Sequence, residues 1–185
     1  MDTTYWQIVQ SFNNRQYKTG IEHKRGIFLP DAVYGQALDS LVVACVDIIL
    51  VFNNQIMIAK RNWQPQPDWW IIGGRMRKGE LYEEAALRNI QRELSLVIQA
   101  ERLELFNFYS LIWDKRAQEP VGNGSHTLSV VMQLCLTESE VAALTLNEEY
   151  EDAIWLTLEA VIGCPKTYHP ALIQIARDLQ AKLNS

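Results

Sequence analysis

The stretch over residues 73–96, GGRMRKGELYEEAALRNIQRELSL, constrains the fold more than any other part of the chain. It follows the apolar run of residues 69–72, so its two glycines mark the end of a strand where the backbone approaches another group closely. Beyond Gly79, apolar residues recur at spacings of three and four, which predicts an amphipathic helix. Its predicted apolar face consists of Ala86, Leu87, Ile90, Leu94 and Val97.

Glu93 lies at the shoulder of this predicted face, close in sequence to the basic loop that follows the glycines. A carboxylate near a glycine turn and several arginines suits a divalent cation that holds a phosphate. Seven of the 17 Lys and Arg residues lie between Lys60 and Arg92, although the formal charge of the chain is −5. This pattern favours a small phosphorylated ligand over a nucleic acid or an anionic membrane. A chance cluster on a solvated helix is the alternative.

Composition indicates one globular domain. A chain of 185 residues with 48% hydrophobic residues can bury a sizeable core without disulfides. Three cysteines, Cys45, Cys135 and Cys164, lack paired or metal-type spacing and lie in apolar surroundings, which predicts buried free thiols in a reducing compartment. No signal peptide is evident at the start, and the apolar run over residues 41–52 is too short to span a bilayer. We therefore expect a cytoplasmic protein.

The remaining pattern predicts alternating strands and helices around this stretch. A helix over residues 4–14 and a polar linker form an N-terminal segment, residues 1–26, ahead of a main domain over residues 27–185. Asn53 and Asn54 mark a hairpin turn between two strands. Strands are expected over residues 41–52, 55–61, 102–113 and 127–136 and before Leu156, and helices over residues 30–38, 138–144 and 169–183. Pattern alone indicates an α/β or α+β domain.

Residues 73–96 resemble the Nudix box, which reads Gly, five residues, Glu, seven residues, then Arg-Glu-apolar-x-Glu-Glu-x-Gly-apolar. The positions in register are Gly74, Glu80, Arg88, Ile90, Glu93 and Leu96, whereas Asn89, Arg92 and Ser95 replace two glutamates and a glycine. A box that opens with GGR and keeps only its last glutamate is similar to that of GDP-mannose mannosyl hydrolases. The resemblance implies an α/β fold of the Nudix type, an α/β/α sandwich with a mixed β-sheet.

The resemblance also implies a metal and a reaction. Because two helix glutamates are missing, at most one Mg²⁺ (or Mn²⁺) is expected, held by the Gly73 carbonyl, Glu93 and Glu149. The implied reaction is hydrolysis of a nucleoside diphosphate sugar of the GDP-mannose type, in which water attacks the sugar and the nucleoside diphosphate leaves. Homodimers are usual in that family, so a homodimer is expected, with a small-molecule substrate and neither nucleic acid nor membrane as partner.

Four residues match substrate-binding positions of that family or support its box. Arg61 and Arg75 match arginines that contact the diphosphate and neutralise it as it leaves. Arg88 is expected to pair with carboxylates near the loop or with Glu84. Asp47 matches a strand aspartate that faces the sugar, and an Asp at an exposed strand edge is the alternative.

The match fails at the expected base. Tyr150 stands where the family has its catalytic histidine, and a tyrosine with a reference pKa of about 10 is a poor base at neutral pH. Three explanations stay open from sequence alone. Glu151 or Asp152 serves as the base; the enzyme is instead a Nudix pyrophosphatase that cuts between the phosphates; or the chain binds a nucleotide sugar without turnover.

Overall fold

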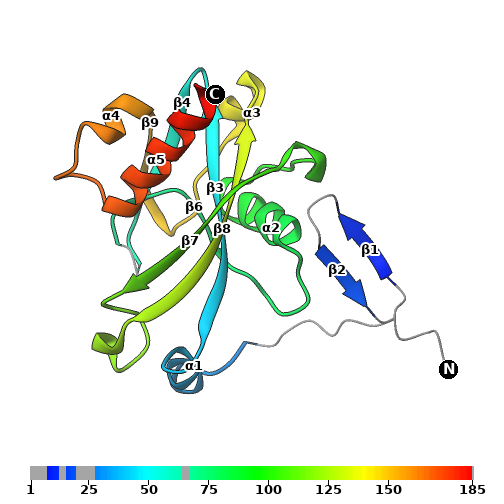
Figure 1. The fold of residues 1–185 in the computed structure, drawn as a ribbon, viewed down its shortest axis with the longest axis vertical. Coiled ribbons are helices and arrows are strands. Elements are labelled where there is room, and N and C mark those ends of the chain that lie inside the picture. The colour runs from blue at the N-terminus through cyan, green and yellow to red at the C-terminus, as the bar shows by residue number, and fades with distance from the viewer. Residues whose placement is uncertain (1–7, 13–15, 20–27, 64–66, 185) are drawn as a thin grey trace.

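The computed structural model describes residues 8–12, 16–19, 28–63 and 67–184. Residues 28–63 and 67–184 form a mixed sheet between two layers of helices (Figure 1). Within these residues the sheet has seven strands in the order β5-β4-β3-β8-β7, with β6 also paired to β3 and β9 to β4. The β3–β8 pair is parallel and the other pairs are antiparallel. The strands are β3 (Val42–Phe52), β4 (Gln55–Arg61), β5 (Trp69–Trp70), β6 (Ile72–Arg75), β7 (Glu104–Trp113), β8 (Ser125–Cys135) and β9 (Tyr150–Thr157).

The helices cover both faces of this sheet, so the predicted α/β/α sandwich with a mixed sheet is confirmed. One face packs against α2, and the other against α4 and α5 (Figure 1). The helices are α1 (Asp31–Leu38), α2 (Tyr82–Leu94), α3 (Glu138–Ala143), α4 (Leu158–Ile162) and α5 (Pro170–Leu183), with short 3₁₀ turns η2 (Ala100–Arg102) and η3 (Val121–Asn123).

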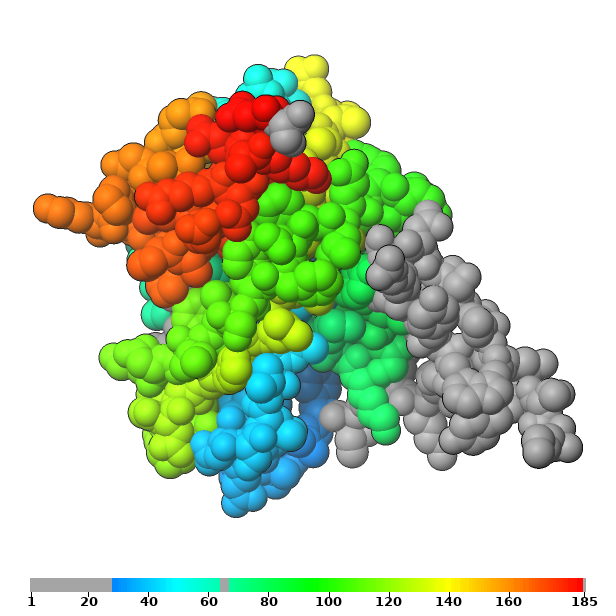
Figure 2. Space-filling model, viewed as in Figure 1, coloured from blue at the N-terminus to red at the C-terminus, as the bar shows by residue number. Residues whose placement is uncertain are grey.

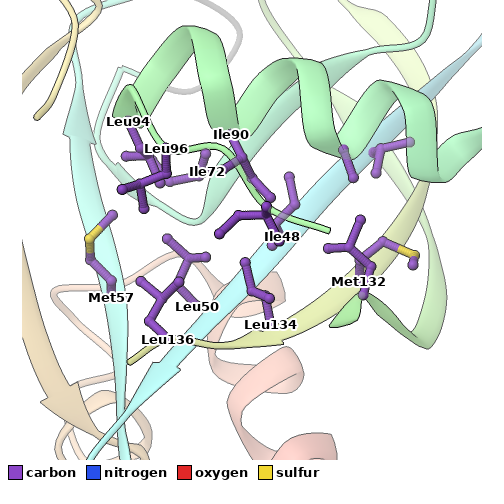
Figure 3. Packing of buried hydrophobic residues seen from close by; sticks show 14 of the residues in the cluster. Ile48, Leu50, Met57, Ile72, Ile90, Leu94, Leu96, Met132, Leu134 and Leu136 are labelled. Atoms are coloured by element: carbon purple, nitrogen blue, oxygen red, sulfur yellow. The ribbon is translucent and has the colours of Figure 1, made fainter. Parts of the chain in front are cut away.

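Alternation along β3 divides the core into its two halves. Ile48 and Leu50 are fully buried on the α2 side, whereas Ile49 is buried among residues of α5. Figure 3 shows the α2 side, where Ile90 of the helix lies beside Ile48 of β3 and Leu94 lies beside Leu96 and Ile72. These contacts fix α2 against the sheet and thereby fix the position of Glu93 on the same helix.

Helix α1 is attached to the sheet by one buried arginine. Arg116, in the loop between β7 and β8, donates to Asp39 Oδ1 at 2.7 Å and to the carbonyl of Gly124 at 3.2 Å. Gly35 allows the helix to approach this loop, because a Cβ there would lie 2.7 Å from the Glu119 carbonyl oxygen. In Figure 2, α1 (blue) lies at the lower end of the visible face and α5 (red) at the upper end.

The N-terminal helix predicted over residues 4–14 is wrong where the structure describes it. Ile8–Phe12 is strand β1 and pairs antiparallel with β2, Gln16–Thr19, in a separate two-stranded sheet. The two strands also replace the start of the predicted linker. Residues 1–7, 13–15 and 20–26 lie outside the described residues, and the division of the chain at residue 27 stays a prediction.

Two predictions about burial are wrong. Helix α2 ends at Leu94 because Ser95 adopts a left-handed conformation with φ of 59°, so Val97 leaves the apolar face and is 77% exposed. The thiols are free as predicted, yet Cys135 and Cys164 are exposed; only Cys45 lies largely inside, where burial raises its pKa to about 12. In the part of the chain that the structure describes, no helix is long and apolar enough to cross a bilayer.

Candidate functional site

A cavity of about 630 Å³ lies between α1, the adjacent end of the sheet and the loop that follows β6. Its cations outnumber its carboxylates two to one, although the whole chain is acidic. The cations are Arg61, Arg75, Arg77, Lys78, Arg88 and Arg92, and the carboxylates are Asp31, Asp47 and Glu149. Aromatic rings of Phe28, Tyr34, Trp63, Trp70 and Trp113 complete the wall. Such a lining suits a ligand that combines an anion with flat rings or sugars.

Gly73 forms the floor of the site because it allows β6 to lie directly against β3. It pairs with Asp47 across the two strands, and a Cβ at residue 73 would lie 2.4 Å from both Asp47 Oδ1 and the Val46 carbonyl oxygen. The predicted close approach at this glycine is confirmed, but Gly73 and Gly74 lie within strand β6 and do not end a strand as predicted. Its N–H donates to Glu93 Oε2 at 3.2 Å, which connects the turn to helix α2.

Glu93 is a fully buried carboxylate with a donor for each oxygen. Its Oε2 accepts from the Gly73 N–H and from the Tyr150 hydroxyl, and its Oε1 accepts from Arg92 Nη2. A buried charge needs such partners because it has lost its hydration. Glu93 therefore joins α2, the glycine turn and β9 at one point.

Arg92 extends this cluster to Glu149. Its Nη1 lies 3.0 Å from Glu149 Oε1, while its Nη2 contacts Glu93. The third oxygen predicted to hold a metal, the Gly73 carbonyl, accepts from Arg61 Nη2 at 2.8 Å. The structure thus brings the three predicted metal ligands together, but each faces an arginine. As arranged, this donor set does not fit a divalent ion, and the described residues hold no cluster of three His, Cys, Asp or Glu side chains suited to one.

Tyr150 takes part in the same network without the properties of a base. Its hydroxyl donates to Glu93 and accepts from Arg61 Nη2 at 2.9 Å. Burial raises the pKa of Tyr150 above its ordinary value, and the nearby Glu93 carboxylate raises it further against the opposing effect of Arg61. The phenol therefore stays protonated and positions its two neighbours.

The two alternative bases are not brought into the site. Glu151 follows Tyr150 on β9 and points to the opposite face, where its carboxylate pairs with Lys60 at 2.9 Å and is half exposed. Asp152 is exposed and accepts from the Ala153 N–H at 2.8 Å. Neither lines the cavity. The catalytic role predicted for Glu151 is therefore wrong, because its side chain points away from the cavity and pairs with Lys60.

Arg88 holds the basic loop in place. It forms two contacts with Glu80, from Nε at 2.6 Å and from Nη2 at 2.8 Å, and its Nη2 also donates to the Arg75 carbonyl at 2.9 Å. The predicted supporting role fits this geometry with Glu80 as the partner, since Glu84 instead accepts from the Leu81 N–H at 2.8 Å. Arg88 lines the cavity, but its donors contact Glu80, Asn89 and the Arg75 carbonyl, so it fixes the end of β6 where Arg75 lies.

Of the two arginines predicted to bind the diphosphate, Arg61 and Arg75, Arg75 has the more accessible guanidinium. Its side chain is exposed and lies over the ring of Tyr34, with 4.4 Å from Cζ to the ring centroid. Arg61 is more enclosed, and its Nε is buried without a hydrogen-bond partner among the described residues. Both predicted diphosphate-binding arginines line one cavity.

Asp47 lies inside the cavity wall and is not at an exposed strand edge. It is 8% exposed and accepts from the Ser129 hydroxyl on the neighbouring strand β8. Burial raises the pKa of Asp47 to about 6, against the lowering effects of Ser129 and Arg61. The group is therefore a carboxylate that loses its proton close to physiological pH.

This raised pKa predicts a pH-dependent stability difference between the wild type and Asp47→Asn. At pH 4 and below, Asp47 is protonated in the folded chain and costs little. As pH rises from 4 to above 6, ionisation becomes less favourable in the folded than in the unfolded chain, so the wild type loses about 3 kcal/mol relative to the variant. Urea unfolding of both proteins at pH 4.5 and 7.5 measures about 2 kcal/mol of this difference, because the unfolded carboxyl, with its lower pKa, is already largely ionised at pH 4.5. Parallel pH profiles would contradict it.

Sequence reasoning missed three contacts of this site. The sequence places Arg92 in the basic cluster and among the departures from the motif but assigns it no contact; a basic residue where a carboxylate belongs is the signal for its ion pairs. Ser129 and Tyr34 carried no signal, because they reach Asp47 and Arg75 only through strand pairing and the position of α1.

Comparisons with known proteins agree with the fold. The NUDIX domain family matches residues 42–179. Among solved structures, a MutT NUDIX hydrolase from Burkholderia pseudomallei has a TM-score of 0.60 at 20% identity, covering 75% of this chain and 98% of that one. A bifunctional NMN adenylyltransferase/ADP ribose pyrophosphatase from Francisella tularensis has a TM-score of 0.60 at 18% identity, covering 81% and 44%. A MutT/nudix family protein from Enterococcus faecalis has a TM-score of 0.51 at 20% identity, covering 63% and 44%. This chain thus spans less than half of the last two.

Proposed function

Because this chain belongs to the NUDIX domain family, we propose that it hydrolyses a nucleoside diphosphate derivative, with a nucleotide sugar of the GDP-mannose type as its substrate class. The observation that carries the proposal is the arginine-lined cavity at the glycine turn. Planar guanidinium groups match the oxygens of a diphosphate in geometry and charge. The aromatic wall offers surfaces on which a base can stack.

The residues of the cavity have separate roles in this proposal. Arg61 and Arg75 bind the diphosphate and neutralise the charge that develops as it leaves. Asp47 lies at the sugar end, where it accepts a hydrogen bond from a hydroxyl. Asp47 lines the cavity and its pKa is raised to about 6 by burial, so it also takes a proton from attacking water at neutral pH. Glu93 and Tyr150 hold the turn and Arg61 in position.

Two other functions each have one observation in their favour. The name of the Francisella tularensis protein includes ADP ribose pyrophosphatase, which favours cleavage between the phosphates. The engagement of Glu93 and Tyr150 by arginines favours a binding module that does not turn its ligand over. The products of the reaction separate all three.

The test is incubation of the purified chain with GDP-mannose, GDP-glucose and ADP-ribose, in Mg²⁺, in Mn²⁺ and in EDTA, followed by ³¹P NMR. We expect nucleoside diphosphate and free hexose. Nucleoside monophosphate with sugar phosphate would assign the chain to the pyrophosphatases. Absence of products, together with a raised melting temperature in the presence of the nucleotide sugar, would assign it a binding role.

A further inference from the structure

Arg92 places a guanidinium between the two carboxylates that a metal would use. Its Nη2 contacts Glu93 Oε1 and its Nη1 lies 3.0 Å from Glu149 Oε1. The backbone supports this arrangement, because the Asn147 N–H donates to the Glu93 carbonyl at 3.0 Å and so holds the loop before β9 against α2. A Cβ on Gly74 would lie 3.6 Å from Arg92 Nη2, so the guanidinium lies over the glycine turn.

Charge balance explains why this pairing is stable. Glu93 is 0% exposed and needs a positive neighbour, whereas the Arg92 side chain is 42% exposed and keeps contact with water. A divalent ion would need oxygen lone pairs at about 2.0–2.6 Å. Those of Glu93, Glu149 and Gly73 face Arg92 or Arg61, so an incoming cation would have to displace both arginines and would meet their repulsion.

We propose that Arg92 is the built-in cation of this site: it replaces the divalent ion between Glu93 and Glu149 and lets the cavity bind a diphosphate group without metal. A guanidinium carries five N–H donors, and the two carboxylates use two of them. Arg92 lines the same cavity as Arg61 and Arg75, so we infer that its remaining donors serve a ligand bound there. The exclusion of a metal ion by Arg92 is independent of the proposed function. The binding of a diphosphate by Arg92 rests on the proposed function.

Mn²⁺ titration followed by electron paramagnetic resonance of the free ion tests the exclusion. The wild type is expected to bind Mn²⁺ only weakly at this site. Arg92→Gln should gain a site at least ~10-fold tighter, because it frees both carboxylates and removes one positive charge. Arg92→Ala serves as a second variant, and circular dichroism establishes that each protein is folded.

Arg77→Gln is the matched control for charge. Arg77 lines the same cavity and lies over the Phe28 ring at 5.4 Å, and among the described residues it forms no ion pair with Glu93 or Glu149. Its loss therefore lowers the charge of the cavity equally and frees neither carboxylate. We expect less than ~3-fold change in Mn²⁺ affinity for this control. Adding Glu149→Gln to Arg92→Gln should abolish the gained site. An equal gain in Arg77→Gln, or a gained site that survives Glu149→Gln, would overturn the proposal.

Calorimetric titration with inorganic pyrophosphate tests the second half. In EDTA the wild type is expected to bind pyrophosphate, and Arg92→Gln should bind it at least ~10-fold more weakly. Two results would show that Arg92 does not replace the ion. The first is that the wild type binds pyrophosphate only when Mg²⁺ is present. The second is that the wild type, without any substitution of Arg92, already binds Mn²⁺ tightly. Neither measurement involves turnover, so both stand apart from the outcome of the product assay.

Discussion

Replacement of Gly73 by alanine is expected to destabilise the folded chain by about 3 kcal/mol or more and to abolish ligand binding. A Cβ at this position would lie 2.4 Å from the Val46 carbonyl oxygen and 2.6 Å from Asp47 Cα. These atoms belong to the backbone of the central strand β3, which is paired on its other side to β8 and cannot move away at low cost. The strand β6 would have to separate from β3 and carry the Arg75 loop with it.

Urea unfolding monitored by tryptophan fluorescence measures this loss of stability. Gly122→Ala is the matched control, because a Cβ at residue 122 would meet nothing within 4 Å, and its stability should change by less than about 0.5 kcal/mol. If Gly73→Ala unfolded at the same urea concentration as Gly122→Ala, the close approach of β6 to β3 would not constrain the fold.

The main elements of the fold could be predicted because their signals are local. Alternation and apolar runs gave the long strands β3, β4, β7 and β8 within a few residues. Asn53 and Asn54 adopt φ of 48° and 61°, as a tight hairpin turn requires. The Nudix arrangement came from the spacing of the box, which no periodicity could supply.

The mistakes arose where the deciding factor was not local. The apolar spacing in residues 4–14 fits a helix, yet Ile8–Phe12 pairs with Gln16–Thr19, and such pairing overrides a short-range pattern. Val97 continued the helical spacing, but the left-handed Ser95 ended the helix two residues earlier. Ser95 stands where the box has a glycine, so the departure itself was the available signal.

The sequence predicts which residues lie together in the site better than it predicts the hydrogen bonds and ion pairs that they form. Residues 61, 73, 75, 93 and 149 lie together as the resemblance implies. The partners of their polar atoms depend on side chains from other elements, and here the substituted residues decide. Arg92 takes both carboxylates, and Tyr150 takes the place of a base while serving as a donor to Glu93. The residues that depart from the motif, Arg92 and Tyr150, thus determine the partners of the site's polar atoms, which the matching positions do not predict.

Replacement of Glu93 by glutamine is expected to lower turnover at least ~100-fold and the stability of the fold by about 2 kcal/mol. The carboxylate accepts from Gly73, Tyr150 and Arg92, whereas an amide has one oxygen and presents an NH₂ group to at least one of these donors. The hydrogen bond from the Gly73 N–H to Glu93 on α2 is then weakened or lost. The Tyr150 hydroxyl is no longer held in the orientation in which it accepts from Arg61. The effect should therefore fall on the bound diphosphate and on the packing of the turn together.

Steady-state kinetics on the active nucleotide sugar and urea unfolding measure the two effects of Glu93→Gln. Glu148→Gln is the control, because Glu148 is an exposed neighbour of Glu149 and its replacement removes the same charge outside the network. Its turnover should stay within ~2-fold of the wild type, and its free energy of unfolding within about 0.5 kcal/mol. Stability lost with turnover retained would leave Glu93 as a structural residue alone. Turnover lost with unchanged stability would place its role at the reacting groups, because a buried carboxylate that only holds the turn cannot be neutralised without weakening the fold.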